Sequence, residues 1–226
     1  KASAIQPETP CVSVPQKESV KDILNDYAKK NKSHIEYLDS FIGFNFSLSI
    51  LGLHQEENIS LAIKGATKLF NISNNTIKRG IKNFYWPGRI QLIINKPKTI
   101  FDVAHNDDSL LALCDTVESL NIKGNINLLL SLQKTKLLNT AILKINKTFD
   151  KIIFTQLNDK MYFANELQNI FSHRNSIVEE DVFLSMNIGS SITTSNDLLV
   201  IAGSHYWAEY IETKYKFSLG NNIIKS

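Results

Sequence analysis

The clearest signature of the fold is Asp197-Leu-Leu-Val-Ile-Ala-Gly-Ser204, in which five consecutive apolar residues lead into a glycine and a serine. A strand that is apolar on both faces is typical of a parallel sheet, because helices cover both sides of such a sheet. A helical pattern follows at residues 205–214. The stretch therefore predicts an interior strand, a tight polar loop at its carboxyl end, and then a helix.

The same succession of strand and helix patterns extends back to residue 89. Strand patterns cover residues 89–94, 98–102, 125–132 and 151–155, and helical patterns cover residues 109–120, 137–149 and 164–171. Alternation of this kind predicts an α/β fold, here a Rossmann-like C-terminal domain with a mainly parallel sheet flanked by helices.

The N-terminal residues make a separate block. Strand patterns cover residues 10–14 and 34–38, helical patterns cover residues 19–30, 56–70 and 74–83, and the apolar residues 41–53 favour strand and loop. The composition then changes at Phe84-Tyr-Trp-Pro-Gly88, which is typical of a linker. We therefore expect two domains, residues 1–84 and residues 85–226.

Composition argues against several classes of function. The chain has 226 residues and is 43% hydrophobic, and its net charge of +3 carries no basic stripe, so a nucleic-acid partner is not expected. The sequence shows neither a membrane span nor a signal peptide, so no membrane partner is expected. Cys11 and Cys114 have no partner at metal or disulfide spacing, which favours buried, inert thiols and a cytoplasmic location.

Two strands end in loops of small and polar residues, Asp102-Val-Ala-His-Asn106 and Gly203-Ser-His205. Ligands of open α/β sheets sit beyond the carboxyl ends of the strands, so both loops are expected at one rim. The Asp102 carboxylate is suited to accept hydrogen bonds from ribose hydroxyls or to hold a cation. The alternative is that Asp102 or Asn106 only caps the helix that starts near Asp107.

Arg89 follows a glycine that lets the backbone approach a ligand, and a guanidinium there can clamp a phosphate or a carboxylate. The alternative is a solvated arginine on a strand edge. The amides of Gln55 and Asn58 lie near an expected helix start, where they can read a base edge or, more simply, cap the helix.

In their order along the chain these fragments are far more specific. They are His54-Gln-Glu-Glu-Asn58, Trp86-Pro-Gly-Arg89, Ile100-Phe-Asp-Val-Ala-His-Asn106 and Val200-Ile-Ala-Gly-Ser204. The series resembles the dihydrofolate synthase/folylpolyglutamate synthase family, a branch of the Mur ligase superfamily. Lys1-Ala-Ser-Ala-Ile-Gln-Pro7 is similar to a further family stretch, with Ser3 in place of a glycine.

The resemblance implies an ATP-dependent ligase that joins L-glutamate to dihydropteroate or folate through an acyl phosphate, with Mg²⁺ as the metal. It makes residues 1–84 the C-terminal remnant of a Mur-type ATP-binding domain and residues 85–226 the Mur-ligase C-terminal domain. On the nucleotide side it implies that Asn58 contacts the adenine, Arg89 the ribose and phosphates, and Asp102 the ribose.

The same resemblance assigns the remaining site residues. His105 and Ser204 are similar to rim residues that help to place glutamate, and they are the catalytic candidates. Lys1 falls where the family has a lysine that is often carbamylated to help to hold magnesium.

The chain also departs from the family. Its 226 residues contain no Gly-x-x-Gly-x-Gly-Lys-Ser/Thr phosphate loop. Gln133-Lys-Thr-Lys136 stands where an Asp-Lys-Asp motif is usual, so that only Lys134 matches, and Asn158-Asp-Lys160 stands where a Pro-Arg pair is common.

Three interpretations follow. The chain is part of a ligase that is a monomer when complete and whose N-terminal phosphate-loop half is missing here, or it is a split or degenerate remnant or partner subunit of such a ligase. The third is a different Mur-type ligase or an unrelated nucleotide-binding module. Under the first two, the chain alone is expected to be inactive.

Overall fold

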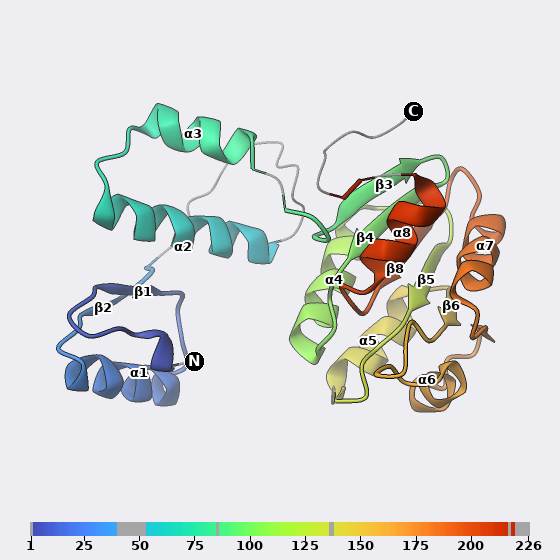
Figure 1. Ribbon diagram of the computed structural model, residues 1–226, viewed down its shortest axis with the longest axis horizontal. Coiled ribbons are helices and arrows are strands. Elements are labelled where there is room, and N and C mark those ends of the chain that lie inside the picture. Colours follow the sequence, from blue (N-terminus) through green and yellow to red (C-terminus); the bar gives the residue numbers. More distant parts are fainter. Residues whose placement is uncertain (1, 40–52, 85, 136–137, 217, 220–226) are drawn as a thin grey trace. The chain divides into compact units, whose positions relative to one another are not determined.

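The computed structural model describes residues 2–39, 53–84, 86–135, 138–216, 218 and 219, and for residues 53 and 54 it describes the backbone only. The described residues fall into two compact units, the first ending at residue 84 and the second beginning at residue 86. Each unit is described below by itself (Figure 1). The assignment of the units to particular ligase domains stays a prediction.

The first unit holds three helices, α1 (Glu18–Lys30), α2 (Leu53–Leu69) and α3 (Asn74–Lys82), and a short 3-10 turn at Ala2–Ala4. Its strands β1 (Cys11–Ser13) and β2 (Ile35–Tyr37) pair in parallel. On β2, Glu36 forms ion pairs with Lys64 and Lys68 of α2. The Lys64 ammonium, followed by that of Lys68, lowers the pKa of Glu36 to about 2, so these contacts tie α2 to the two-stranded sheet.

The second unit is built on a six-stranded sheet in the order β3-β4-β8-β5-β6-β7. Only β3 runs antiparallel to its neighbour, and the other strand pairs are parallel. The strands are β3 (Gln91–Asn95), β4 (Lys98–Asp102), β5 (Ile126–Leu130), β6 (Lys151–Phe154), β7 (Ser176–Val178) and β8 (Leu198–Ala202). The mainly parallel sheet expected from the sequence is thus confirmed.

Helices cover both faces of this sheet (Figure 1). One core cluster packs α4 (Asp107–Ser119), α5 (Thr140–Thr148) and α6 (Ala164–Phe171) against inward side chains such as Leu128 and Val200. The other packs α7 (Val182–Ile192) and α8 (Trp207–Tyr215) against residues such as Leu129 and Ile201. Every residue of β8 is buried, because helices cover the sheet on both faces at this strand. This burial explains why the run Leu198–Ala202 is apolar throughout.

The 3-10 turn at Ala2–Ala4, β7 and α7 were absent from the sequence prediction, and several boundaries differ from it by up to three residues, such as the start of α5 at Thr140 rather than residue 137. Strand β7 has only three residues and lies at the sheet edge, and α7 is rich in serine and apolar residues, so neither has a clear periodic pattern. The strand expected from residue 89 starts at Gln91, because Ile90 has a left-handed backbone with φ 45°. The expected elements at 41–53 lie mostly outside the described residues.

The two cysteines differ. Cys114 is fully buried in α4, so the prediction of a buried thiol is confirmed there, and burial raises the pKa of this thiol to about 12, which disfavours the reactive thiolate. Cys11 is only half-buried, because the strand that carries it belongs to a sheet of just two strands. Along the described part of the chain, no helix combines the length and apolarity that crossing a membrane would need.

Candidate functional site

Three neighbouring strands end at the same level of the second unit's sheet. Asp102 at the end of β4 is level with Ala202 at the end of β8, and Ala202 is level with Leu130 at the end of β5. The loops that carry His105, Ser204 and Lys134 therefore leave the sheet side by side. The sequence correctly placed the first two at one rim.

Asp102 is almost completely buried, with 4% of its surface exposed. One carboxylate oxygen, Oδ2, accepts the backbone N–H of Ile90 at 2.9 Å, and Oδ1 accepts that of Ala104 at 2.7 Å. Burial raises the pKa of Asp102, and these two N–H groups and the charge of Arg89 oppose that rise. The carboxylate thus joins the turn before β3 to the end of β4, which is a structural role that the sequence did not reveal.

The helix cap is Asn106 rather than Asp102. The Asn106 side chain accepts the backbone N–H of Ser109 at 2.9 Å, and it is the N-cap of α4. In return, the Ser109 hydroxyl accepts the backbone N–H groups of His105 and Asn106 at 3.0 and 3.1 Å. The capping interpretation is therefore confirmed for Asn106, and the loop that carries His105 is held rigidly by these bonds.

Arg89 lies in a turn that is anchored on both sides. Gly88 has φ +69°, and a Cβ there would come within 2.7 Å of Val103 Cγ1, so this close approach requires glycine. The Gly88 carbonyl accepts the Val103 N–H at 2.9 Å, and Ile90 is bound to Asp102. Arg89 itself is half-buried and precedes β3, so it is not a solvated residue on a strand edge.

His105 and Ser204 occupy the loops on either side of the β4–β8 boundary. The His105 Nδ1 lies 2.8 Å from the Val103 carbonyl oxygen, so this nitrogen carries the proton and Nε2 is the acceptor of the neutral ring. Ser204 is 3% exposed, and its Oγ accepts the Tyr206 N–H at 3.2 Å. The Trp207 indole donates to the Ala202 carbonyl at 2.8 Å and so closes this turn.

The other predicted site residues belong to the first unit. Asn58 is exposed on α2 and donates to the Gln55 side chain at 3.3 Å. Because α2 already begins at Leu53, Asn58 lies inside the helix, so the prediction that it caps a helix start was wrong. Lys1 lies outside the described residues. Within the described ranges, no three His, Cys, Asp or Glu side chains gather to form a metal site.

The two segments that depart from the family pattern contact each other. Gln133 bridges to Met161, the Lys134 N–H donates to the Lys160 carbonyl at 3.2 Å, and the Tyr162 hydroxyl donates to the Lys134 carbonyl at 3.1 Å. The Lys134 ammonium lies 4.6 Å from the Phe163 ring centre. Lys136 lies outside the described residues. Nothing in the sequence connects these two segments, but the fold brings them into contact.

A mainly parallel sheet, covered on both faces and carrying polar loops at one rim, defines a class of ligand-binding α/β domain. Comparison with known proteins makes this more specific. Dihydrofolate synthase/folylpolyglutamate synthase from Bacillus subtilis is 25% identical over 174 residues, which are 74% of this chain and 40% of that protein. The enzyme of the same name from Buchnera aphidicola (subspecies Acyrthosiphon pisum) is 26% identical over 139 residues, 60% of this chain and 33% of its own length.

Solved structures agree on the fold. Mycobacterium tuberculosis folylpolyglutamate synthase complexed with ADP superposes with a TM-score of 0.83 at 17% identity, covering 92% of this chain and 55% of that chain. Escherichia coli FolC in complex with DHPP and ADP gives a TM-score of 0.81 at 18% identity, covering 94% and 54%. No family model matches the sequence. The chain is thus similar to proteins named dihydrofolate synthase/folylpolyglutamate synthase, and it spans 33–40% of the length of these curated relatives and 54–55% of the solved chains.

Proposed function

We propose that this chain is the C-terminal portion of an ATP-dependent ligase that adds L-glutamate to dihydropteroate, to folates or to both, through an acyl phosphate. The observation that carries the proposal is the anchored rim of the second unit, where Arg89, Asp102, His105 and Ser204 lie at the ends of neighbouring elements. The relationship to ligases of that name supports the choice of reaction.

On the nucleotide side, Arg89 is the stronger of the two rim candidates. Its guanidinium has no hydrogen bond or ion pair with any other residue that the structure describes, and it is close enough to Asp102 to act on the pKa of that carboxyl. Asp102 already accepts two backbone N–H groups, so it offers a ribose only its remaining lone pairs. In this proposal Arg89 clamps the phosphates, Asp102 holds the Arg89 turn and the ribose, and Asn58 contacts the adenine.

On the acceptor side, His105 and Ser204 orient the incoming glutamate. Because Nδ1 of His105 is bound to the Val103 carbonyl, Nε2 is the ring nitrogen left to face the amine that must attack the acyl phosphate. The Ser204 hydroxyl accepts from Tyr206, and its own proton is not needed for that bond. It can therefore donate to a carboxylate of the amino acid.

The proposed metal is Mg²⁺, which would neutralise charge on the transferring phosphoryl group. One relative was solved with AMPPNP and a manganese ion, which supports a divalent ion in general. The described residues of this chain gather no cluster of three His, Cys, Asp or Glu side chains. The described residues therefore offer no set of ligands that fits a metal ion, and we assign no step of the reaction to a metal.

The segments around Lys134 and Lys160 depart from the motifs of the family. This departure favours a second candidate, a split or degenerate non-catalytic remnant or partner subunit of such a ligase. The two candidates agree that residues 1–226 alone are inactive. They differ in what happens when a phosphate loop is supplied, because a remnant would have lost the rim geometry that turnover needs.

The first experiment compares residues 1–226 with a chimera in which they replace the matching segment of the Bacillus subtilis relative. Alone, the chain should bind ATP no more tightly than about millimolar, equivalent to roughly 4 kcal/mol, and should release no phosphate with Mg²⁺, dihydropteroate and L-glutamate. The chimera should turn over. Micromolar binding or turnover by the chain alone would contradict the proposal, and a folded but inactive chimera would favour the degenerate remnant.

The second experiment tests Arg89 in that chimera. Arg89→Ala should lower kcat by about 100-fold, with a smaller change in the KM for ATP, because a phosphate clamp acts most strongly in the transition state. Arg174→Ala is the matched control, since Arg174 is exposed next to β7, at the opposite edge of the sheet. Equal rates for the two variants would remove Arg89 from the site.

A further inference from the structure

We propose that Asp107 is a positioning residue of the candidate site, which holds the start of α5 in place relative to the loop that carries His105. The proposal rests on the proposed function and deepens it. Asp107 is the first residue of α4 and follows His105-Asn106 directly. Its sequence position indicates only the start of α4, but its carboxylate contacts the N-terminus of a different helix, α5.

The Asp107 carboxylate caps the N-terminus of α5. Oδ1 accepts the backbone N–H groups of Asn139 and Ala141, each at 2.9 Å. Oδ2 accepts the Thr140 N–H at 3.3 Å and the Thr140 hydroxyl at 2.5 Å. The Thr140 hydroxyl, followed by the backbone N–H groups, lowers the pKa of Asp107 to about 2, so the carboxylate is charged at any ordinary pH.

Helix α5 has no cap of its own. Its N-cap residue, Asn139, makes no side-chain capping bond. The first N–H groups of a helix need an acceptor, and a carboxylate at that end also interacts favourably with the helix dipole. Asp107 supplies both from 32 residues away in the chain. The start of α5 is therefore defined by α4 and not by its own sequence.

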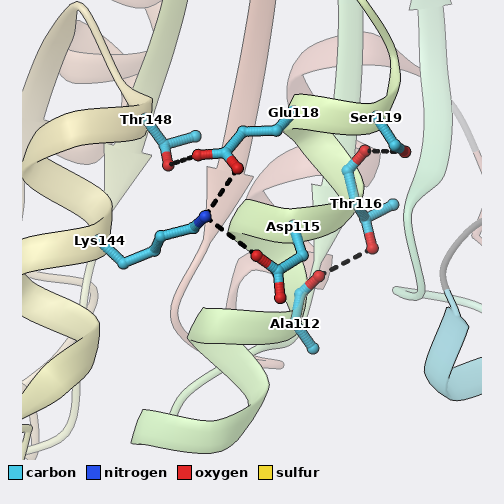
Figure 2. A network of polar contacts seen from close by, with 7 residues as sticks. All are labelled: Ala112, Asp115, Thr116, Glu118, Ser119, Lys144 and Thr148. Carbon is cyan, nitrogen blue, oxygen red and sulfur yellow. Dashed lines mark hydrogen bonds and ion pairs between the residues drawn. The ribbon is translucent and has the colours of Figure 1, made fainter.

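A second contact joins the two helices farther from the rim (Figure 2). Lys144 of α5 forms ion pairs with Asp115 and Glu118 of α4 at 3.0 and 2.6 Å, and the Thr148 hydroxyl donates to Glu118 at 2.8 Å. This network keeps the helices paired along their length. Loss of the Asp107 contact should therefore release the first turn of α5 without separating the helices.

The position of Asp107 connects it to the candidate site. The loop after β4 carries His105, the segment after β5 carries Lys134, and β8 with Ser204 lies between these two strands. Asp107 ties the first loop to the start of α5, the helix that follows β5, and so it connects the elements that follow the two strands on either side of β8. A shift of either loop would change the spacing across the rim, and a misplacement of about 1 Å can weaken a site severely.

The chain offers a matched control in Asp108. It lies in the same first turn of α4, carries the same charge and is exposed. Asp107→Ala removes both acceptor oxygens. Asp107→Asn keeps one oxygen, which can still accept from Asn139 and Ala141. Asp108→Asn makes the same charge change without touching the cap.

The test uses the ¹⁵N-labelled chimera of the first experiment, with amide exchange at Asn139–Ala141 and the shifts of the His105 and Ser204 amides as L-glutamate is added with ATP present. In Asp107→Ala, exchange should quicken about tenfold and the half-saturating L-glutamate concentration should rise by about tenfold. Asp107→Asn should give an intermediate rise, and Asp108→Asn should match the unsubstituted chimera.

Two outcomes would overturn the proposal, and they differ. Faster exchange in Asp107→Ala with an unaltered response to L-glutamate would make Asp107 a helix cap alone. No response of the rim amides in the unsubstituted chimera, even at high ATP and L-glutamate, would refute the proposed function, and the positioning role would fall with it. Only the second outcome affects the chimera without any substitution.

Discussion

Gly203→Ala should destabilise the second unit by more than about 3 kcal/mol, the largest loss that we expect from a single methyl group. Gly203 has φ +109°, a backbone conformation that side chains rarely adopt. A Cβ at this position would lie 2.0 Å from the Ser131 carbonyl oxygen, which is backbone at the end of β5 and cannot move aside. The chain would have to open the contact between the ends of β8 and β5.

The measurement is urea unfolding followed by circular dichroism, with Gly189→Ala as the control. Gly189 is buried in α7, and the atoms nearest to a Cβ there would be the side-chain tips of Leu199 at 3.3 Å and Ile153 at 3.5 Å. The helical propensity of alanine offsets this crowding, so the net change should stay within about 1 kcal/mol. Equal midpoints for the two variants would show that the β8 turn tolerates a side chain, contrary to the geometry.

Asp102→Ala should destabilise the second unit by about 2–4 kcal/mol, because two buried donors lose their acceptor. The donors are the backbone N–H groups of Ile90 and Ala104, and the residue whose carboxylate accepts them is only 4% exposed. Asp102→Asn should lose less, since its carbonyl oxygen can still accept from one donor. Thermal and urea unfolding measure both losses.

This stability effect changes how the nucleotide assignment has to be tested. A loss of ATP binding in Asp102→Ala would follow from a displaced Arg89 turn as well as from a lost ribose contact. Asn106→Ala is the comparison, because it removes a helix cap at the same rim and leaves the Asp102 bonds intact. If Asp102→Ala unfolds at the same urea concentration as the unchanged chain, the buried bonds are not the structural tie inferred here.

Much of the fold could be predicted because its causes are local. Runs such as Leu198–Ala202 are apolar on both faces wherever they occur, and only an interior strand of a parallel sheet suits them. Polar residues directly after such runs predicted the rim loops with His105 and Ser204. The bounds of β4 and α6 agree with the sequence patterns, because both elements end at a clear change of composition.

The tertiary structure alone decided which groups these residues contact. The sheet places β8 between β4 and β5, although it is the last strand in the chain, and so it puts Ser204 between the loops of His105 and Lys134. In the folded chain the Asp102 carboxylate accepts the backbone N–H of Ile90. The Asp107 carboxylate accepts N–H groups at the start of α5, 32 residues away. Sequence patterns indicate how a residue affects the helix or strand that contains it. Hydrogen bonds between elements depend on strand order and close approach, which exist only once the chain has folded.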